Sequence, residues 1–155
     1  MDSTRRAVLR GVWAMGAMAA AVASGILGPS RAFAAWNKGA FEAKSTLDAM
    51  RALGVANAED TKAIEIRAPD IAENGAVVPI DITSNIPGTT AISVFIEKNP
   101  FPYTGTFDFS QGAVPYVHLR VKIGESSPVR VVATAGGKHY TSSKEVKVTI
   151  GGCGG

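Results

Sequence analysis

The sequence has few of the residues that most often form catalytic or metal-binding sites. Its 155 residues include one cysteine and two histidines. Zinc and copper sites take several nitrogen and sulfur ligands held together. His118 takes an outward position of an alternating segment and His139 follows a predicted hairpin turn, so both are expected at the surface, and the only methionine after residue 34 is Met50. We therefore expect no metal site, no cofactor belonging to the protein itself and no catalytic set.

The chain also lacks net charge once its first 34 residues are set aside. Residues 1–34 carry four arginines and one aspartate, whereas the whole chain has a formal charge of +3. The remaining 121 residues (155 − 34) hold twelve basic (16 − 4) and twelve acidic (13 − 1) side chains. Proteins that bind nucleic acid need an excess of positive charge. The charge balance therefore predicts no nucleic-acid partner.

The first 34 residues have the three parts of an export signal. The basic pair Arg5 and Arg6 is followed by an uncharged run over residues 11–28 and by a small-x-small sequence that ends at Ala34. Paired arginines are typical of the twin-arginine route, which exports folded proteins. We predict export to the periplasm, with cleavage between Ala34 and Ala35. An uncleaved membrane anchor is the alternative, but the run only reaches the lower length limit for a span and includes four glycines.

Residues 35–57 predict a single amphipathic helix. Its apolar residues recur at spacings of three and four, which places them on one face. Gly54 is expected to end the helix. The apolar stripe consists of Ala40, Phe41, Ala43, Leu47, Met50 and Leu53.

Residues 58–150 change to an alternating pattern that predicts β-strands. Six or seven short strands, separated by turn residues and without helices between them, favour an antiparallel β-sandwich of the immunoglobulin-like kind over a small open barrel. The pair Gly136-Gly137 predicts a two-residue hairpin turn. The clearest inward sets are Val78, Ile80 and Ile82; Ile92, Val94 and Ile96; Val117, Leu119, Val121 and Ile123; and Val146, Val148 and Ile150, with a short strand also expected near Phe107 and Phe109. The carboxylates Asp70, Glu73, Asp81 and Asp108 fall at turns or outward positions and are interpreted as solvated charges.

The only cysteine, Cys153, lies third from the end of the sequence in the segment Gly-Gly-Cys-Gly-Gly, residues 151–155. A lone cysteine cannot form a disulfide within the chain, so it is either a reactive thiol or a link to another chain. Gly151, Gly152, Gly154 and Gly155 leave the segment thin and free in its backbone dihedrals. We predict a flexible arm that places the thiol roughly 10 Å beyond the last strand.

The environment of Cys153 in the sequence does not activate the thiol. An ordinary cysteine has a pKa near 8.5, so a few per cent is thiolate at neutral pH. No nearby residue in the sequence lowers that value. The arrangement indicates a carrier whose thiol is activated by the enzymes that receive it.

Two other interpretations of Cys153 and its neighbours remain open. The first is an exported, non-catalytic β-sandwich binding module that dimerises through a Cys153 disulfide. The second is a ubiquitin-like sulfur carrier, in which the terminal Gly154-Gly155 would be activated by ATP. The second is disfavoured because an exported protein has no ATP supply and because the expected strands exceed those of a β-grasp fold.

Five features together resemble the SoxY family, the sulfur-carrier subunits of the periplasmic thiosulfate-oxidising system. They are the ending "VKVTIGGCGG", the segments "AENGAVVPIDI" and "EKNPFP", the leading helical segment and the twin-arginine signal. The resemblance spans essentially the whole chain after residue 34. It implies that Cys153 carries thiosulfate-derived sulfur as an S-thiosulfonate and a persulfide, and that the protein is a substrate carrier and not an enzyme.

The resemblance also implies partners. A haem c enzyme would conjugate thiosulfate to the thiol, a hydrolase would release sulfate and a sulfane dehydrogenase would oxidise the remaining sulfur. A second small β-sandwich protein of the SoxZ type, which lacks an export signal of its own, would form a heterodimer with this chain and be exported with it.

Overall fold

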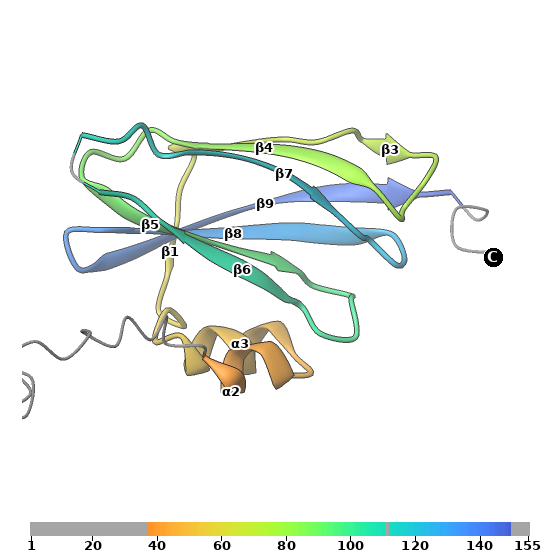
Figure 1. Ribbon diagram of the computed structural model, residues 1–155, viewed down its shortest axis with the longest axis horizontal. Helices are drawn as coiled ribbons and strands as arrows, with labels where there is room; N and C mark the ends of the chain where they lie inside the picture. Colours follow the sequence, from red (N-terminus) through yellow and green to blue (C-terminus); the bar gives the residue numbers. More distant parts are fainter. Residues whose placement is uncertain (1–36, 111, 150–155) are drawn as a thin grey trace, which may run out of the picture. The chain divides into compact units, whose positions relative to one another are not determined.

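The computed structural model describes residues 37–110 and 112–149 (Figure 1). The helices are α2 (Lys38–Glu42) and α3 (Thr46–Ala52), and the strands are β1 (Glu59–Asp60), β2 (Ile64–Arg67), β3 (Ile71–Ala72), β4 (Val78–Ser84), β5 (Thr89–Ile96), β6 (Tyr103–Asp108), β7 (Tyr116–Val121), β8 (Ser127–Ala135) and β9 (Lys138–Val148).

The strands form two sheets that pack face to face as a β-sandwich, which confirms the predicted fold class (Figure 1). The larger sheet has the order β1-β9-β8-β5-β6, and the smaller has the order β2-β4-β7. Pairing is antiparallel except at the two-residue strands β1 and β3, which both run parallel to β9. The alternating pattern did not predict these two strands because two residues are too few to show a period.

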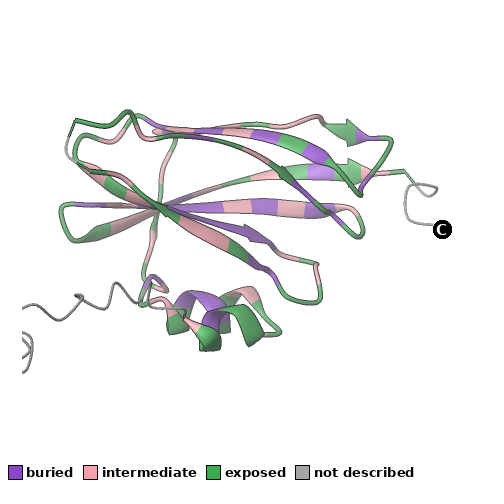
Figure 2. Cartoon of the chain, in the orientation of Figure 1, coloured by how far each residue is buried: buried purple, intermediate pink, exposed green. Residues whose placement is uncertain are grey.

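Inward residues of both sheets form the main core (Figure 2). The predicted inward residues of β4 and β5 are each 0% exposed: Val78, Ile80, Ile82, Ile92, Val94 and Ile96. Val117, Val121, Ile123 and Val146 are also buried, while Leu119 and Val148 are partly buried against the same cluster. Period-two alternation therefore identified this core correctly, since alternate side chains of a strand point to the same face.

The predicted hairpin turn is confirmed at Gly136-Gly137. Both glycines have positive φ, 56° and 75°, and the flanking residues Ala135 and Lys138 pair directly. Positive φ at both central residues is what a type I′ turn requires, and glycine adopts it without steric cost. The turn fixes the register of β8 against β9, the strand that leads to the cysteine segment.

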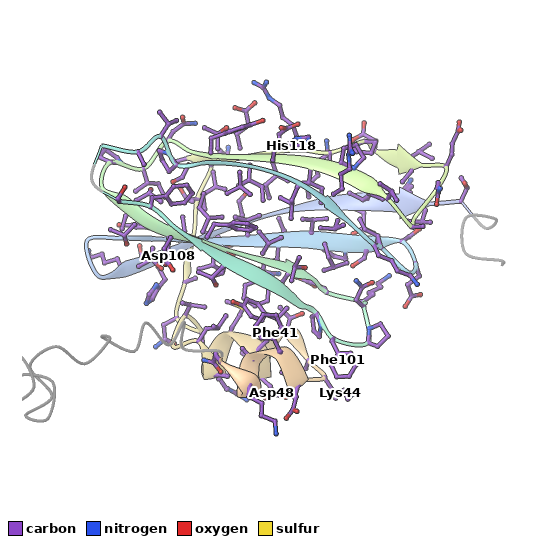
Figure 3. The ribbon with its side chains drawn as sticks, in the orientation of Figure 1. Phe41, Lys44, Asp48, Phe101, Asp108 and His118 are labelled. Carbon is purple, nitrogen blue, oxygen red and sulfur yellow. The ribbon has the colours of Figure 1, made fainter. Side chains whose placement is uncertain are left out.

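A second, smaller core lies on the other face of the larger sheet, between the sheet and the helices α2 and α3 (Figures 1 and 3). Phe95 and Tyr103 project from the sheet into it, with ring centroids 5.6 Å apart, and Tyr103 also lies 4.5 Å from the ring of Phe41. Ala40 and Met50 are buried on the helical side. The helical segment is therefore held to the sheet by apolar packing.

The prediction of one continuous helix was wrong. Ala43 adopts extended backbone angles (φ −61°, ψ 136°), and Ser45 then caps a separate helix by accepting a hydrogen bond from the amide of Asp48. Serine is a favoured cap because its hydroxyl satisfies an amide that the helix leaves unpaired. The break rotates the apolar stripe, so Leu47 is 49% exposed. Gly54 does follow the second helix, with φ 74°.

Candidate functional site

The predicted attachment residue and its neighbours lie outside the described residues. This applies to Cys153, Gly151, Gly152, Gly154, Gly155 and Ile150, and to the signal residues Arg5, Arg6, Ala34 and Ala35. What the structure does describe is the root of the predicted arm, by which we mean residues Lys147–Thr149. The candidate site is therefore built from the end of β9 and the residues that hold it.

One side of the root is held by β3 and the residues beside it. Lys147 and Val148 pair in parallel with Ile71 and Ala72. The amide of Lys147 donates to the carbonyl of Asp70 at 3.0 Å, and the amide of Thr149 donates to the carbonyl of Ala72 at 3.2 Å. These bonds extend the ordered backbone to the last described residue, one position beyond the strand.

The other side of the root is held by a side chain instead of a strand. The ladder between β8 and β9 ends at the pair Ser127–Val146, two residues before Val148. The hydroxyl of Ser126 accepts a hydrogen bond from the amide of Val148 at 2.9 Å and donates a longer one, at 3.4 Å, to its carbonyl oxygen. One serine thus pairs with both backbone groups that a neighbouring strand would have bonded.

Gly75 packs directly against the root. Its carbonyl accepts a hydrogen bond of 2.7 Å from the amide of Ile123. A Cβ atom at position 75 would lie 2.4 Å from the Ile123 carbonyl oxygen and 2.8 Å from Cγ1 of Val148. Both distances are shorter than van der Waals contact, so any side chain here would displace the backbone or Val148. Glycine is required because the chains approach too closely for anything larger.

The position of the root limits how far the cysteine reaches. Cys153 is four residues beyond Thr149 in the sequence. At about 3.3–3.6 Å per extended residue, its Cα lies at most roughly 14 Å from that of Thr149. Thr149 is exposed, and Ile71 beside the root is 58% exposed. The root therefore opens directly onto solvent.

The described residues contain no group of three or more His, Cys, Asp or Glu side chains able to hold a metal ion. Nδ1 of His139 lies 3.0 Å from the hydroxyl oxygen of Thr134.

No helix among the described residues has the length and apolar content needed to cross a membrane. One polar cluster among the described residues lies on the smaller sheet.

That cluster joins Asp81, Tyr116 and His118, which lie on the outward face of β4 and β7; His118 is labelled in Figure 3. The Tyr116 hydroxyl donates to the Asp81 carboxylate, and Nδ1 of His118 lies 2.9 Å from the same oxygen. The hydrogen bonds from Tyr116 and His118 lower the pKa of Asp81, while the bond to Asp81 raises the pKa of Tyr116. The side chains of His118 and Asp81 are 51% and 37% exposed, and their hydrogen bonds join β4 to β7 at the surface of the smaller sheet.

The interpretation of Asp81 as a solvated charge was incomplete. Asp81 and His118 are directly opposite in the β4–β7 register, although they are 37 positions apart in the sequence. The sequence pattern places each residue at an outward polar position of its own strand. It does not specify that β4 pairs with β7, and this pairing is the information needed to predict that Asp81 and His118 meet.

Comparison with protein families matches residues 49–153 to the family described as sulfur oxidation protein SoxY. Among solved structures, the sulfur carrier protein SoxY from Chlorobium limicola f thiosulfatophilum is 42% identical, with a TM-score of 0.60 over 67% of this chain and 96% of that one. A superoxide reductase (neelaredoxin) from Ignicoccus hospitalis has a TM-score of 0.50 at 18% identity, over 56% of this chain and 80% of that one. The second likeness is one of fold alone. No curated protein sequence matches the chain.

Proposed function

The chain belongs to the SoxY family of sulfur oxidation proteins, and from this membership we propose that it holds sulfur covalently on Cys153 and presents it to periplasmic enzymes. The observation that carries the proposal is the extent of the family match, which runs through residue 153 and so includes the sole cysteine. The ordered root at Lys147–Thr149 supports it, because a carrier arm needs a fixed point of attachment.

The first step joins thiosulfate to the thiol. The Cys153 thiol and the outer sulfur of thiosulfate form a sulfur–sulfur bond, and the reaction releases one proton and two electrons. A haem c enzyme takes the electrons. Since an ordinary thiol is mostly protonated at neutral pH, the partner enzyme supplies the activation. The product is a cysteine S-thiosulfonate.

Hydrolysis follows at the outer end of the adduct. Water adds to the sulfone sulfur, sulfate leaves with a proton, and a persulfide remains on Cys153. A sulfane dehydrogenase then takes six electrons from the outer sulfur of the persulfide, three waters supply its oxygen atoms and seven protons are released, which leaves a sulfonate on Cys153. A second hydrolysis frees sulfate and restores the thiol. Throughout, the chain is the substrate carrier and the partners are the enzymes.

The arm composition suits repeated transfer. Glycines on both sides of Cys153 keep the segment narrow, so that it fits a channel too small for ordinary side chains. Ordering each residue in such a channel costs about 1–2 kcal/mol of backbone entropy. The cost weakens each complex and favours release after each step, which a carrier that visits several enzymes requires.

The proposal includes export and a second subunit. The signal over residues 1–34 directs the folded chain through the twin-arginine route, with cleavage between Ala34 and Ala35. A SoxZ-type β-sandwich protein without its own signal forms a heterodimer with this chain and is exported with it.

The test is intact-protein mass spectrometry after incubation with thiosulfate and the haem c enzyme. We expect a mass increase equal to one S2O3 unit, located by fragmentation on the C-terminal peptide, and no such increase in Cys153→Ser. An unmodified wild-type protein, or adducts that persist in Cys153→Ser, would refute the proposal. A population found entirely as a reducible Cys153-linked dimer would favour the binding-module interpretation instead.

A further inference from the structure

The end of β9 lacks the support that holds the rest of the strand. From Lys138 to Val146 the strand pairs with β8 at every position, but at Val148 that neighbour is absent. The end of a strand with unpaired backbone groups frays readily. The hydroxyl of Ser126 closes this gap because it bonds both the amide and the carbonyl of Val148.

Gly75 reinforces the same position from the loop between β3 and β4. Its carbonyl is tied to Ile123, and its missing side chain allows the loop to pack against Val148. Gly75 lies 73 positions before Val148 in the sequence, in the segment "AENGAVVPIDI". The fold thus places this segment against the strand that leads to Cys153. Local packing around Val148 explains both a serine at position 126 and a glycine at position 75.

The state of the root determines the effective length of the arm. If Val148 and Thr149 came loose, two more residues would move with Cys153. A longer free segment spreads the thiol over a larger volume, which lowers its effective concentration at a docked enzyme. It also adds residues that must be ordered when the arm enters a channel. Both effects act on binding of the arm and leave the chemistry of the bound thiol unchanged.

We propose that Ser126 and Gly75 are positioning residues that clamp the root at Val148 and so set the reach of Cys153. The inference rests on the proposed function, since a clamp matters for transfer only if Cys153 carries the substrate. Its first consequence, however, concerns the backbone alone. The exchange of the Val148 and Thr149 amides with solvent reports the clamp without any partner enzyme.

The main variant is Ser126→Ala in the full mature chain, with Ser143→Ala as the matched control because Ser143 is an exposed serine of β9. We expect amide exchange at Val148 and Thr149 to quicken about fivefold or more, the change that one lost hydrogen bond gives. Amides in the middle of the β8–β9 ladder should keep their wild-type rates. Ser143→Ala should leave all of these rates unchanged.

The kinetic readout uses the haem c enzyme with thiosulfate and varies the concentration of the carrier. For Ser126→Ala we expect the KM for the carrier to rise, by no more than the factor seen in the exchange rates, with kcat unchanged. Ser126→Thr, which keeps a hydroxyl, should restore the wild-type exchange rates and the wild-type KM. The rate at which a small thiol reagent labels Cys153 should be equal in all variants, because the clamp does not alter the thiol itself.

Gly75→Ala provides an independent variant, and Gly105→Ala is its control because a Cβ at position 105 meets no atom within 4 Å. Gly75→Ala should quicken exchange at Val148 more than Ser126→Ala does, and Gly105→Ala should not. If Gly75→Ala does not fold, Ser126→Ala still tests whether the root is clamped at Val148. Wild-type exchange at Val148 in Ser126→Ala, or faster exchange with an unchanged KM, would overturn the inference. Failure of the wild-type protein to accept thiosulfate would refute the proposed function instead, and the exchange data would still test the clamp.

Discussion

Nδ1 of His118 lies 2.9 Å from Oδ1 of Asp81, directly across the ladder that joins β4 and β7. The Tyr116 hydroxyl donates to the same carboxylate oxygen. Two side chains of β7 therefore share one carboxylate oxygen of β4 on the outer face of the smaller sheet. Because β4 and β7 form one ladder, the stability of their pairing depends on the ionisation of Asp81 and therefore on pH.

The first prediction concerns stability in acid. Hydrogen bonds from Tyr116 and His118 hold the pKa of Asp81 below its ordinary value, so the ionised carboxylate favours the folded state. This contribution is fully present above the unfolded pKa of about 3.9 and is lost as pH falls through the lower, folded pKa. Urea denaturation from pH 5 down to about pH 2 should therefore show a steeper loss of stability in the wild type than in Asp81→Asn.

Asp108→Asn is the control for this prediction, because Asp108 is an exposed carboxylate at the end of β6. It should keep the wild-type dependence on pH. Equal slopes for the wild type and Asp81→Asn would show that the three-residue cluster has no net effect on folding.

The second prediction concerns the core beneath the helices. Phe95 is 0% exposed and packs between the larger sheet and α2 and α3. Phe95→Ala should lower the free energy of unfolding by about 3–5 kcal/mol, because it removes a large buried side chain and leaves a cavity. Val114→Ala, at a residue that is 74% exposed, should change it by less than about 0.5 kcal/mol. Urea denaturation monitored by circular dichroism measures both, and a loss below about 1.5 kcal/mol for Phe95→Ala would contradict the assigned packing.

The third prediction concerns the width of the proposed arm. Gly152→Ala and Gly152→Val add one and three carbon atoms beside Cys153. If the arm enters a narrow channel, turnover of the carrier by the haem c enzyme should fall in the order Gly, Ala, Val, while labelling by a small thiol reagent stays nearly constant. Gly105→Val, which changes a glycine of β6, serves as the control. Undiminished turnover of Gly152→Val would mean that the thiol is not delivered through a narrow passage.

Much of the fold was predictable because strands, turns and cores leave local patterns. Alternation in β4 and β5 identified Val78, Ile80 and Ile82 as core residues, and all are fully buried. The glycine pair at residues 136–137 predicted the β8–β9 turn, where both residues have positive φ. The helical segment was harder to predict from the sequence. Its apolar spacing fitted one helix, but Ser45 starts a second helix whose cap depends on a single hydroxyl.

The alternation of side chains predicted the sandwich, and the count of one residue type singled out Cys153, because neither needs knowledge of distant contacts. Which distant residues meet follows only from the folded chain: Asp81 with His118, and Ser126 and Gly75 with Val148. The physical reason is that strand pairing depends on burying both sheets at once. A local pattern shows which face of a strand is apolar, but it does not specify the neighbour against which that strand will lie.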